Sequence, residues 1–414
     1  MSALPDRPSP ERRIDDAPAG MRRRRLLFTN GYARHGGGEV ALLGHVRQRL
    51  MAGDEVRVQL LEDGPVAGML RGMGAQVDID PFAWTGRRVA SLLMLARRTV
   101  SLVARLRRWR ADAVVSYTFT DGVIAAMAGR LLGIPVIWRA QGEMYTADGK
   151  VKGHWLAARL PAFARITRPR IACTTHDEAR RAVAHGVPAS LVDVVPLGID
   201  IHRIASARPA PLPSDPADAP PGGRSGRDRR PRIGVFARLL RWKGQDVFLR
   251  ALALLRRRGV DFEAIVVGGH DFGDGEDYVR ELEEIVRTES LSDRVSLLGH
   301  RDDAAGLMKR CAIVVHCSHQ EPFGLVVIEA MAAGCAVLAS DVSGPRESVE
   351  PGRTGLLVEP GDPARLADAL EALIGDEVLR GRLSRAAGRD VVERFDLRTS
   401  LDRLDALLPG SRAA

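Results

Sequence analysis

Two acidic residues stand out in the second half of the chain. In "HQEPFGLVVIEAMAAG", residues 319–334, Glu321 and Glu329 are eight residues apart, and Glu329 lies within an otherwise apolar run. Burying a carboxylate without a partner is energetically costly, so such a group usually binds something. The alternative is that Glu321 caps a helix and Glu329 belongs to a structural ion pair, because charge pairs of this kind are common.

A second stretch combines two cations with the start of a helix. In "FARLLRWKGQDVFLRA", Arg238 and Lys243 stand at and just after the end of a predicted strand, and Gly244 precedes a predicted helix. The free N–H groups of a helix N-terminus favour an anion, and arginine can bind a phosphate through two donors. The pattern predicts a phosphate-binding site, with two solvated surface cations as the alternative.

The residues between the two glutamates supply backbone donors. We predict that the helix containing Glu329 starts near Phe323 or Gly324, after Pro322. The first N–H groups of a helix have no acceptor within it, so they are available to hydroxyl or phosphate oxygens. Glu321, just before them, could accept hydrogen bonds from sugar hydroxyls or stabilise developing positive charge. Glu329 could reach a ribose diol.

Two glycine-rich loops are further candidates for phosphate binding. "HGGGE" places Gly36, Gly37 and Gly38 after the first predicted strand, and glycine lets the backbone approach a ligand closely. "GGHDFGDGEDY", residues 268–278, is a second such loop. Neither matches a complete dinucleotide or P-loop motif, so a tight strand-to-helix turn is the alternative for both.

The elements that would position these residues alternate between strands and helices. Apolar runs such as "RRLLFTN" and "RIGVFARL" are each followed by a helical pattern, which is the order of a parallel α/β sheet. We predict an α/β fold of two doubly wound domains with a cleft between them, where ligands bind at the carboxyl ends of strands. The predicted parts are a disordered segment (1–20), a first domain (21–204), a flexible linker or loop (205–231), a second domain (232–394) and a C-terminal helix (395–414).

Composition excludes several classes of protein. The 414 residues are 45% hydrophobic and 27% charged, as in soluble globular proteins. No apolar stretch reaches the roughly 18 residues that a membrane-spanning helix needs.

The four cysteines have no C-x-x-C spacing and are predicted to be buried thiols. Cys317 lies near His316 and His319, but the spacing fits no zinc pattern, so no metal site is predicted.

The net charge of +9 is carried by arginine. It permits nucleic acid, anionic lipid or a phosphorylated substrate as a partner. Nucleic acid is not predicted, because the chain has no helix-turn-helix, zinc-finger or aromatic RNA-binding motif. Residues 86–110 contain eight arginines and no acid, and their apolar residues recur at helical spacing. This pattern predicts a helix that lies on an anionic membrane surface, or else a packing helix with a solvated basic face.

In their order along the chain, these motifs resemble glycosyltransferase family 4, whose members are retaining enzymes that use nucleotide sugars. "EPFGLVVIEAMAAG" is similar to the E-x7-E signature of the family, and "ARLLRWKG" to its diphosphate-binding motif. "VVPLGID", residues 194–200, resembles the segment that closes the first domain of the family. Residues 343–370 resemble the region after the signature, and the similarity extends from Leu26 to about Leu407.

The resemblance implies two facing Rossmann-like domains of the GT-B type, with the donor mostly on the second and the last helix crossing back to the first. It implies that Arg238 and Lys243 neutralise the donor diphosphate, and that Glu321 contacts the transferred sugar. These three residues are the candidate catalytic groups. The donor-binding residues that it implies are Gly37, Gly38, Arg238, Lys243, His300, Arg301, Glu321, Phe323, Gly324, Leu325, Val326 and Glu329.

The chain departs from the family in one place near the candidate site. After "IPVI" the family often has a histidine followed by Gly or Asp, whereas this chain has Gln141, Gly142 and Glu143. Glutamine cannot act as a general base. Gln141 and Glu143 are candidate residues of the acceptor side. A smaller departure is Leu197, where the family usually has Asn.

The function implied is a retaining hexosyltransferase-type glycosyltransferase. It would move a sugar from a nucleotide-diphosphate sugar to a glycan or lipid-linked acceptor, in cell-surface polysaccharide or glycolipid biosynthesis. A sugar-nucleotide epimerase or a phosphorylase on the same scaffold is the alternative. No metal or other cofactor is expected. The expected location is the cytoplasm, with attachment to the inner face of the cytoplasmic membrane depending on the basic helix.

Overall fold

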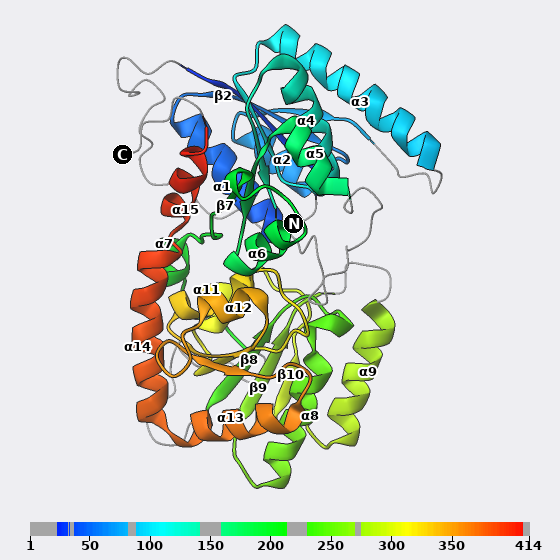
Figure 1. Cartoon of the computed structure of the whole chain (residues 1–414). Coiled ribbons are helices and arrows are strands. Elements are labelled where there is room, and N and C mark those ends of the chain that lie inside the picture. Colours follow the sequence, from blue (N-terminus) through cyan, green and yellow to red (C-terminus); the bar gives the residue numbers. More distant parts are fainter. Residues whose placement is uncertain are drawn as a thin grey trace.

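The computed structural model describes residues 23–31, 33, 37–81, 88–140, 159–212, 230–269 and 275–408. They form two α/β domains stacked end to end, with the first domain in blue to green and the second in green to orange (Figure 1). The predicted α/β fold with two doubly wound domains is confirmed. The predicted disordered segment, residues 1–20, lies outside the described residues.

The first domain is built on a parallel sheet. Within the described residues this sheet has seven strands in the order β3-β2-β1-β4-β5-β6-β7. The central strands β4 and β5 are buried along their whole length and apolar except at their last residues, Ser116 and Arg139, as expected for a sheet covered by helices on both faces. The strands are β1 Arg25–Asn30, β2 Glu55–Leu60, β3 Gln76–Ile79, β4 Ala113–Ser116, β5 Val136–Arg139, β6 Arg170–Cys173 and β7 Val192–Val194.

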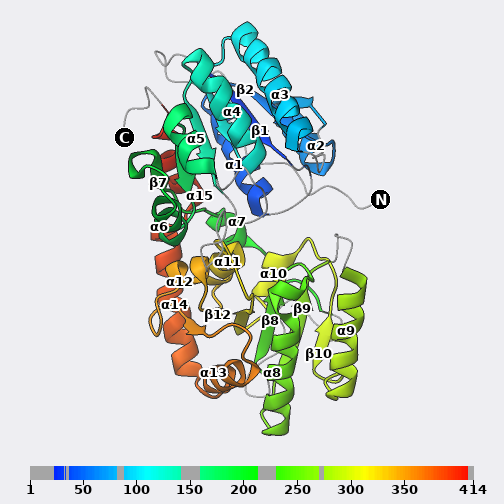
Figure 2. The same ribbon diagram turned by 45° about the vertical axis from the view of Figure 1, so that its right-hand side comes forward.

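Helices connect these strands and cover the sheet, with α3 on the outer surface of the domain (Figures 1 and 2). They are α1 Gly37–Met51, α2 Pro65–Gly72, α3 Arg88–Trp109, α4 Phe119–Leu132, α5 Leu160–Thr167 and α6 His176–Ala184. A short helix, α7 (Ile201–Ser206), follows β7 and leads towards the second domain.

The second domain repeats the same plan. Within the described residues its sheet has six parallel strands in the order β10-β9-β8-β11-β12-β13. The strands are β8 Arg232–Phe236, β9 Glu263–Val267, β10 Val295–Leu297, β11 Ile313–His316, β12 Ala336–Ser340 and β13 Leu356–Val358. The helices are α8 Gln245–Arg257, α9 Gly275–Thr288, α10 Ala304–Met308, α11 Leu325–Ala333, α12 Ser343–Ser348, α13 Pro363–Gly375 and α14 Glu377–Arg394.

The last helices return to the first domain. α14 runs along one side of the molecule, and α15 (Leu397–Asp405) then lies beside α1 (Figure 1). At the junction the N–H of Ile199 donates to the carbonyl of Phe395 at 2.9 Å, and the N–H of Leu397 donates back to Ile199 at 3.0 Å. The chain therefore joins the two domains twice, once through residues 195–212 and once through the α14–α15 junction.

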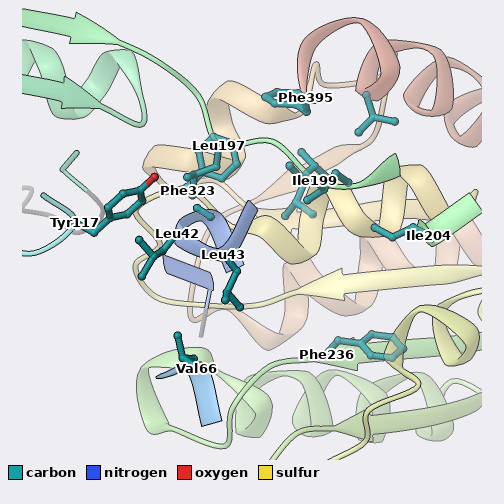
Figure 3. Close-up of a cluster of buried hydrophobic side chains, with 14 of the residues drawn as sticks. Leu42, Leu43, Val66, Tyr117, Leu197, Ile199, Ile204, Phe236, Phe323 and Phe395 are labelled. Carbon is teal, nitrogen blue, oxygen red and sulfur yellow. The ribbon is translucent and has the colours of Figure 1, made fainter. Parts of the chain in front are cut away.

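An apolar cluster extends across the junction between the domains. Leu42 and Leu43 from α1 lie in the same buried cluster as Leu197, Phe323 and Phe395 (Figure 3). The rings of Phe323 and Phe395 meet edge to face with centroids 6.0 Å apart. The domains are therefore packed against each other as well as joined by the chain.

The first part of the predicted flexible linker or loop, residues 205–231, packs against the second domain. Ala210 and Leu212 are both 5% exposed, and the N–H of Ala210 donates to the carbonyl of Gly306 at 3.1 Å. Two apolar residues in a Pro-rich sequence are thus buried against the second domain, which composition alone does not indicate. Residues 213–229 lie outside the described part of the chain.

Candidate active site

The candidate site lies where the order of the second sheet reverses. β9 and β10 follow on one side of β8, whereas β11, β12 and β13 follow on the other. Ligands of doubly wound sheets bind outside the carboxyl ends of the strands at such a switch point. The loop after β8 carries Arg238 and Lys243, and the loop after β11 carries Glu321. The topology thus brings the two motifs together across 78 residues of sequence.

Lys243 and Glu321 are in direct contact. The ammonium group of Lys243 donates to the Oε2 atom of Glu321, and the Nε2 atom of His316 lies 3.3 Å from the same oxygen. Glu321 is 9% exposed. Burial alone would raise its pKa, but the hydrogen bond with His316 and the charge of Lys243 prevail and lower the pKa to about 2. Glu321 is therefore an anion throughout the physiological pH range.

The local fold around Lys243 depends on a glycine. Lys243 ends a short 3₁₀ turn, Arg241–Lys243, and Gly244 follows with φ of 70°. A Cβ atom on Gly244 would lie 2.1 Å from the carbonyl oxygen of Cys317. The ring of Trp242 lies 4.2 Å from the ammonium nitrogen of Lys243, within the range of a cation–π contact. The cation is thus held between an indole ring and a carboxylate.

The N-terminus of α11 adds backbone donors beside this pair. The helix begins at Leu325, with Gly324 before it at φ of 85°. Among the hydrogen bonds of the described residues, none engages the N–H groups of Leu325 and Val326. Phe323 contributes differently, since its ring is buried against Phe395. The helix starts one or two residues later than predicted, because Gly324 takes a left-handed conformation.

Glu329 belongs to the same helix but faces other surroundings. It is half-buried, and burial raises its pKa, while the positive charge of Arg203 on α7 acts in the opposite direction. No contact within the described residues joins Glu329 to Lys243 or Glu321. The structure thus places the two glutamates on one loop-and-helix element with different electrostatic environments.

The loops after β8, β9 and β10 pack side by side at the same edge. The N–H of Gly268 donates to the carbonyl of Gly299 at 2.8 Å, and a Cβ on Gly268 would lie 1.8 Å from the carbonyl oxygen of Ala237. Arg238 directly follows Ala237, and His300 directly follows Gly299. Both side chains are exposed, so both are accessible to a ligand at this edge.

The remaining predicted site residues differ in their contacts and in their positions in the fold. Arg301 is paired with Asp303 at 2.5 Å, and His300 lies 3.2 Å from Asp302. Gly37 and Gly38 begin α1 in the first domain, at the switch point between β1 and β4. The acceptor candidates Gln141 and Glu143 lie outside the described residues.

Sequence reasoning missed His316 and Trp242 as members of the site. His316 was weighed only as a possible metal ligand, although it is the last residue of β11 and stands five residues before Glu321. Its place at the carboxyl end of a strand was the available signal. In the part of the chain that the structure describes, no group of three or more His, Cys, Asp or Glu residues could hold a metal ion.

Comparison with known proteins places both domains in one family. Residues 35–203 match the family described as Glycosyltransferase Family 4, and residues 224–390 match the family described as Glycosyl transferases group 1. The chain belongs to glycosyltransferase family 4. The prediction of this family is therefore confirmed, and the epimerase and phosphorylase alternatives are not favoured.

Several relatives carry the name of an inositol in their own names. The chain is 35% identical over 227 residues to D-inositol 3-phosphate glycosyltransferase of Nocardia farcinica, covering 54% of this chain and 48% of the relative. A protein of that name from an Arthrobacter species is 30% identical over 310 residues, 69% of each chain. Phosphatidyl-myo-inositol mannosyltransferase of Mycobacterium leprae is 33% identical over 253 residues, 57% of this chain and 59% of the relative. The first of these matches thus spans about half of the relative's length.

Two solved structures share the architecture of the whole chain. HepE of Anabaena in complex with UDP-glucose has a TM-score of 0.74 at 25% identity, covering 94% of this chain and 100% of that one. A glycosyltransferase from Rickettsia africae has a TM-score of 0.77 at 16% identity, with the same coverage. The second likeness shows the fold alone, which is the GT-B arrangement of two Rossmann-like domains.

Proposed function

We propose that this family 4 glycosyltransferase moves a hexose, with retention of its anomeric configuration, from a nucleotide-diphosphate sugar to a glycan or lipid-linked acceptor. The pathway would be one of cell-surface polysaccharide or glycolipid biosynthesis. The observation that carries the proposal is the contact of Lys243 and His316 with Glu321, beside the N-terminus of α11 and at the switch point of the second sheet.

The proposed chemistry follows from the charges that develop. Cleavage of the bond between sugar and diphosphate builds positive charge on the sugar and negative charge on the leaving group. Lys243, Arg238 and the amides of α11 would stabilise the diphosphate, because fixed charges and dipoles in a closed cleft act strongly. The anionic Glu321 would stabilise the positive charge or hold sugar hydroxyls. With no nucleophile assigned, retention is proposed to proceed by attack on the same face, with the leaving phosphate accepting the proton.

The donor is proposed to be a nucleotide sugar, as the complex of HepE with UDP-glucose indicates for that relative. A thermal-shift screen with UDP-, GDP-, ADP- and TDP-linked sugars tests this, since a ligand that binds only the folded state raises the unfolding temperature. We expect one nucleotide series to raise it. The anomeric proton coupling of the product then tests retention. Absence of any shift would overturn the proposal of a nucleotide-sugar donor, and an inverted product would overturn the proposal of retention.

The reaction is proposed to need neither metal nor other cofactor. We expect transfer by the enzyme to be unchanged after dialysis against EDTA, whereas a loss that Mg²⁺ or Mn²⁺ restores would contradict this. Incubation with the donor and no acceptor separates a transferase from an epimerase. A transferase yields at most slow hydrolysis, whereas an epimerase converts the nucleotide sugar into its isomer.

A lipid-linked acceptor is supported by α3. Among the described residues of this helix, Leu92, Leu93 and Val100 are 50%, 68% and 68% exposed, and Arg97 and Arg107 are exposed with them. α3 lies on the outside of the first domain, with its N-terminal end towards the second domain (Figure 2). Exposed bulky apolar residues interspersed with arginines suit an anionic lipid surface. No helix in the described ranges is long and apolar enough to cross a membrane.

We therefore propose peripheral attachment to the inner face of the cytoplasmic membrane through α3. Flotation with anionic vesicles at physiological salt tests the attachment, and Leu93→Glu is expected to abolish it. Val378→Glu is the control, because Val378 is 79% exposed on α14 in the other domain. Flotation that is absent in the wild type, or equal in both variants, would remove α3 as the attachment site.

A further inference from the structure

The first turn of α6, in the first domain, is completed by a side chain from the second domain. The N–H groups of His176 and Asp177 both donate to the carboxylate of Glu347 on α12, each at 2.7 Å. The third amide of the turn, that of Glu178, donates to the hydroxyl of Thr175 at 3.1 Å. Glu347 therefore satisfies the two amides that the helix and its cap leave open, and its charge lies at the positive end of the helix dipole.

A second contact reinforces the first. Ser343, at the start of α12, donates to the Oδ2 atom of Asp177 at 2.7 Å and accepts from the guanidinium of Arg181 at 3.1 Å. Arg181 also pairs with Asp177 at 2.5 Å. Ser343 is 7% exposed, so this network is partly shielded from water. Figures 1 and 2 both show α6 beside α12 at the junction of the domains.

The same helix α12 also contacts residues 321–323 of the candidate site. The N–H of Gly344 donates to the carbonyl of Glu321 at 3.1 Å, and a Cβ on Gly344 would lie 2.2 Å from the Cα atom of Phe323. The carbonyl of Glu347 accepts from Arg394 on α14 at 2.6 Å. α12 therefore links α6 of the first domain to residues 321–323 of the candidate site.

We propose that Glu347 is a positioning residue. It holds the first domain against residues 321–323 of the candidate site in the arrangement that transfer requires. Its role in transfer rests on the proposed function, whereas its role in domain contact does not. Glu347 would act through α6 and α12 and touch no reacting atom. Its loss would leave the amides of His176 and Asp177 to water and favour separation of the domains. Donor binding, which involves mainly the second domain, would persist, while turnover would fall because the reacting groups are no longer aligned.

The variants are Glu347→Ala and Glu347→Gln, with Glu350→Ala as the matched control. Glu350 lies three residues further on, is exposed, and pairs with Arg353 of its own domain. The first measurement is hydrogen exchange of the amides of His176 and Asp177 in the whole protein. We expect exchange to rise roughly tenfold or more in Glu347→Ala and to stay unchanged in Glu350→Ala. Glu347→Gln retains one acceptor oxygen, so its exchange rate should lie between those of the other two variants.

The second measurement separates binding from turnover. For Glu347→Ala we expect kcat to fall roughly tenfold to a hundredfold, with the Kd of the nucleotide changed by less than about threefold. Unchanged exchange at residues 176 and 177 would overturn the proposal. A parallel loss of nucleotide binding and turnover would also overturn it, because Glu347 would then only maintain the second domain. If the wild type bound no nucleotide sugar, the proposed function would fail, and the exchange measurement would still decide the domain contact.

Discussion

The imidazole of His45 lies 2.8 Å from the carboxylate of Asp405, which follows it by 360 residues. The other ring nitrogen of His45 lies 2.8 Å from the hydroxyl of Tyr117, and Arg49 donates to Asp405 at 2.9 Å. All four residues are buried. α15 is thus fixed to α1, the helix that begins with the glycines expected to approach the donor. The end of the chain is therefore part of the structure that orients the first domain.

Asp405→Ala is expected to destabilise the first domain by about 1.5–3 kcal/mol, because His45 loses its carboxylate partner and Arg49 keeps only its pairing with Asp54. Asp402→Ala is the control. Asp402 is exposed and accepts one hydrogen bond from Gln48, so its loss should cost less than about 0.5 kcal/mol. Urea unfolding followed by amide exchange in α1 measures both changes. Equal effects of the two substitutions would show that the buried network contributes little.

The free energy of unfolding should also fall in acid, because protonation of Asp405 weakens its contacts with His45 and Arg49. Burial alone would raise the pKa of Asp405, but its bonds to His45 and Arg49 prevail and lower it to about 2; the pKa of Glu321 is also about 2. Ordinary values in an unfolded chain are roughly 3.9 for Asp and 4.3 for Glu, so the unfolded state binds protons first as the pH falls. The stabilisation is complete above about pH 5 and is lost as the pH falls towards 2.

Urea midpoints between pH 7 and pH 3 test this acid dependence. Asp405→Asn should be less stable than the wild type at pH 7, with a smaller further loss between pH 5 and pH 3. An acid dependence identical to that of the wild type would mean that Asp405 is not the titrating group.

Lys243→Ala is expected to lower kcat/KM. The loss corresponds to about 2–4 kcal/mol of transition-state stabilisation, which is the usual cost of removing such a group. Arg241→Ala is the matched control from the same 3₁₀ turn. Arg241 is exposed and pairs with Glu281, so its loss should leave the kinetics nearly unchanged. Steady-state kinetics with saturating acceptor measure both. Turnover like that of the wild type in Lys243→Ala would refute its role at the diphosphate.

Gly244→Ala tests the geometry that places Lys243. Gly244 and Gly259 have φ of 70° and 75°, so alanine costs about 1–2 kcal/mol of backbone energy at either position. Only at Gly244 would the new Cβ meet another group, the carbonyl of Cys317 at 2.1 Å, whereas nothing lies within 4 Å at Gly259. We expect both variants to lose stability and only Gly244→Ala to lose nucleotide affinity. Retained affinity in Gly244→Ala would show that the loop adjusts without moving Lys243.

The alternation of strand and helix patterns was sufficient to predict two doubly wound domains, because hydrophobic periodicity is local. The motifs containing Lys243 and Glu321 were recognisable for the same reason, since each lies within one short segment. The start of α11 was misplaced by one or two residues, because Gly324 takes a left-handed conformation that the local sequence pattern does not specify. The local sequence does not indicate the burial of Ala210 and Leu212 within the predicted linker or loop, because it depends on a surface of the second domain.

The helices and strands, their order and the residue types available for chemistry follow from local sequence patterns. The pairing of charges follows from the fold: Lys243 meets Glu321 and His316, Asp405 meets His45 and Arg49, and Glu347 meets the amides of α6. Each of these contacts except that of His316 joins segments far apart in the chain. Their partners are set by how strands order within a sheet and how the two domains pack, and neither leaves a local pattern in the sequence.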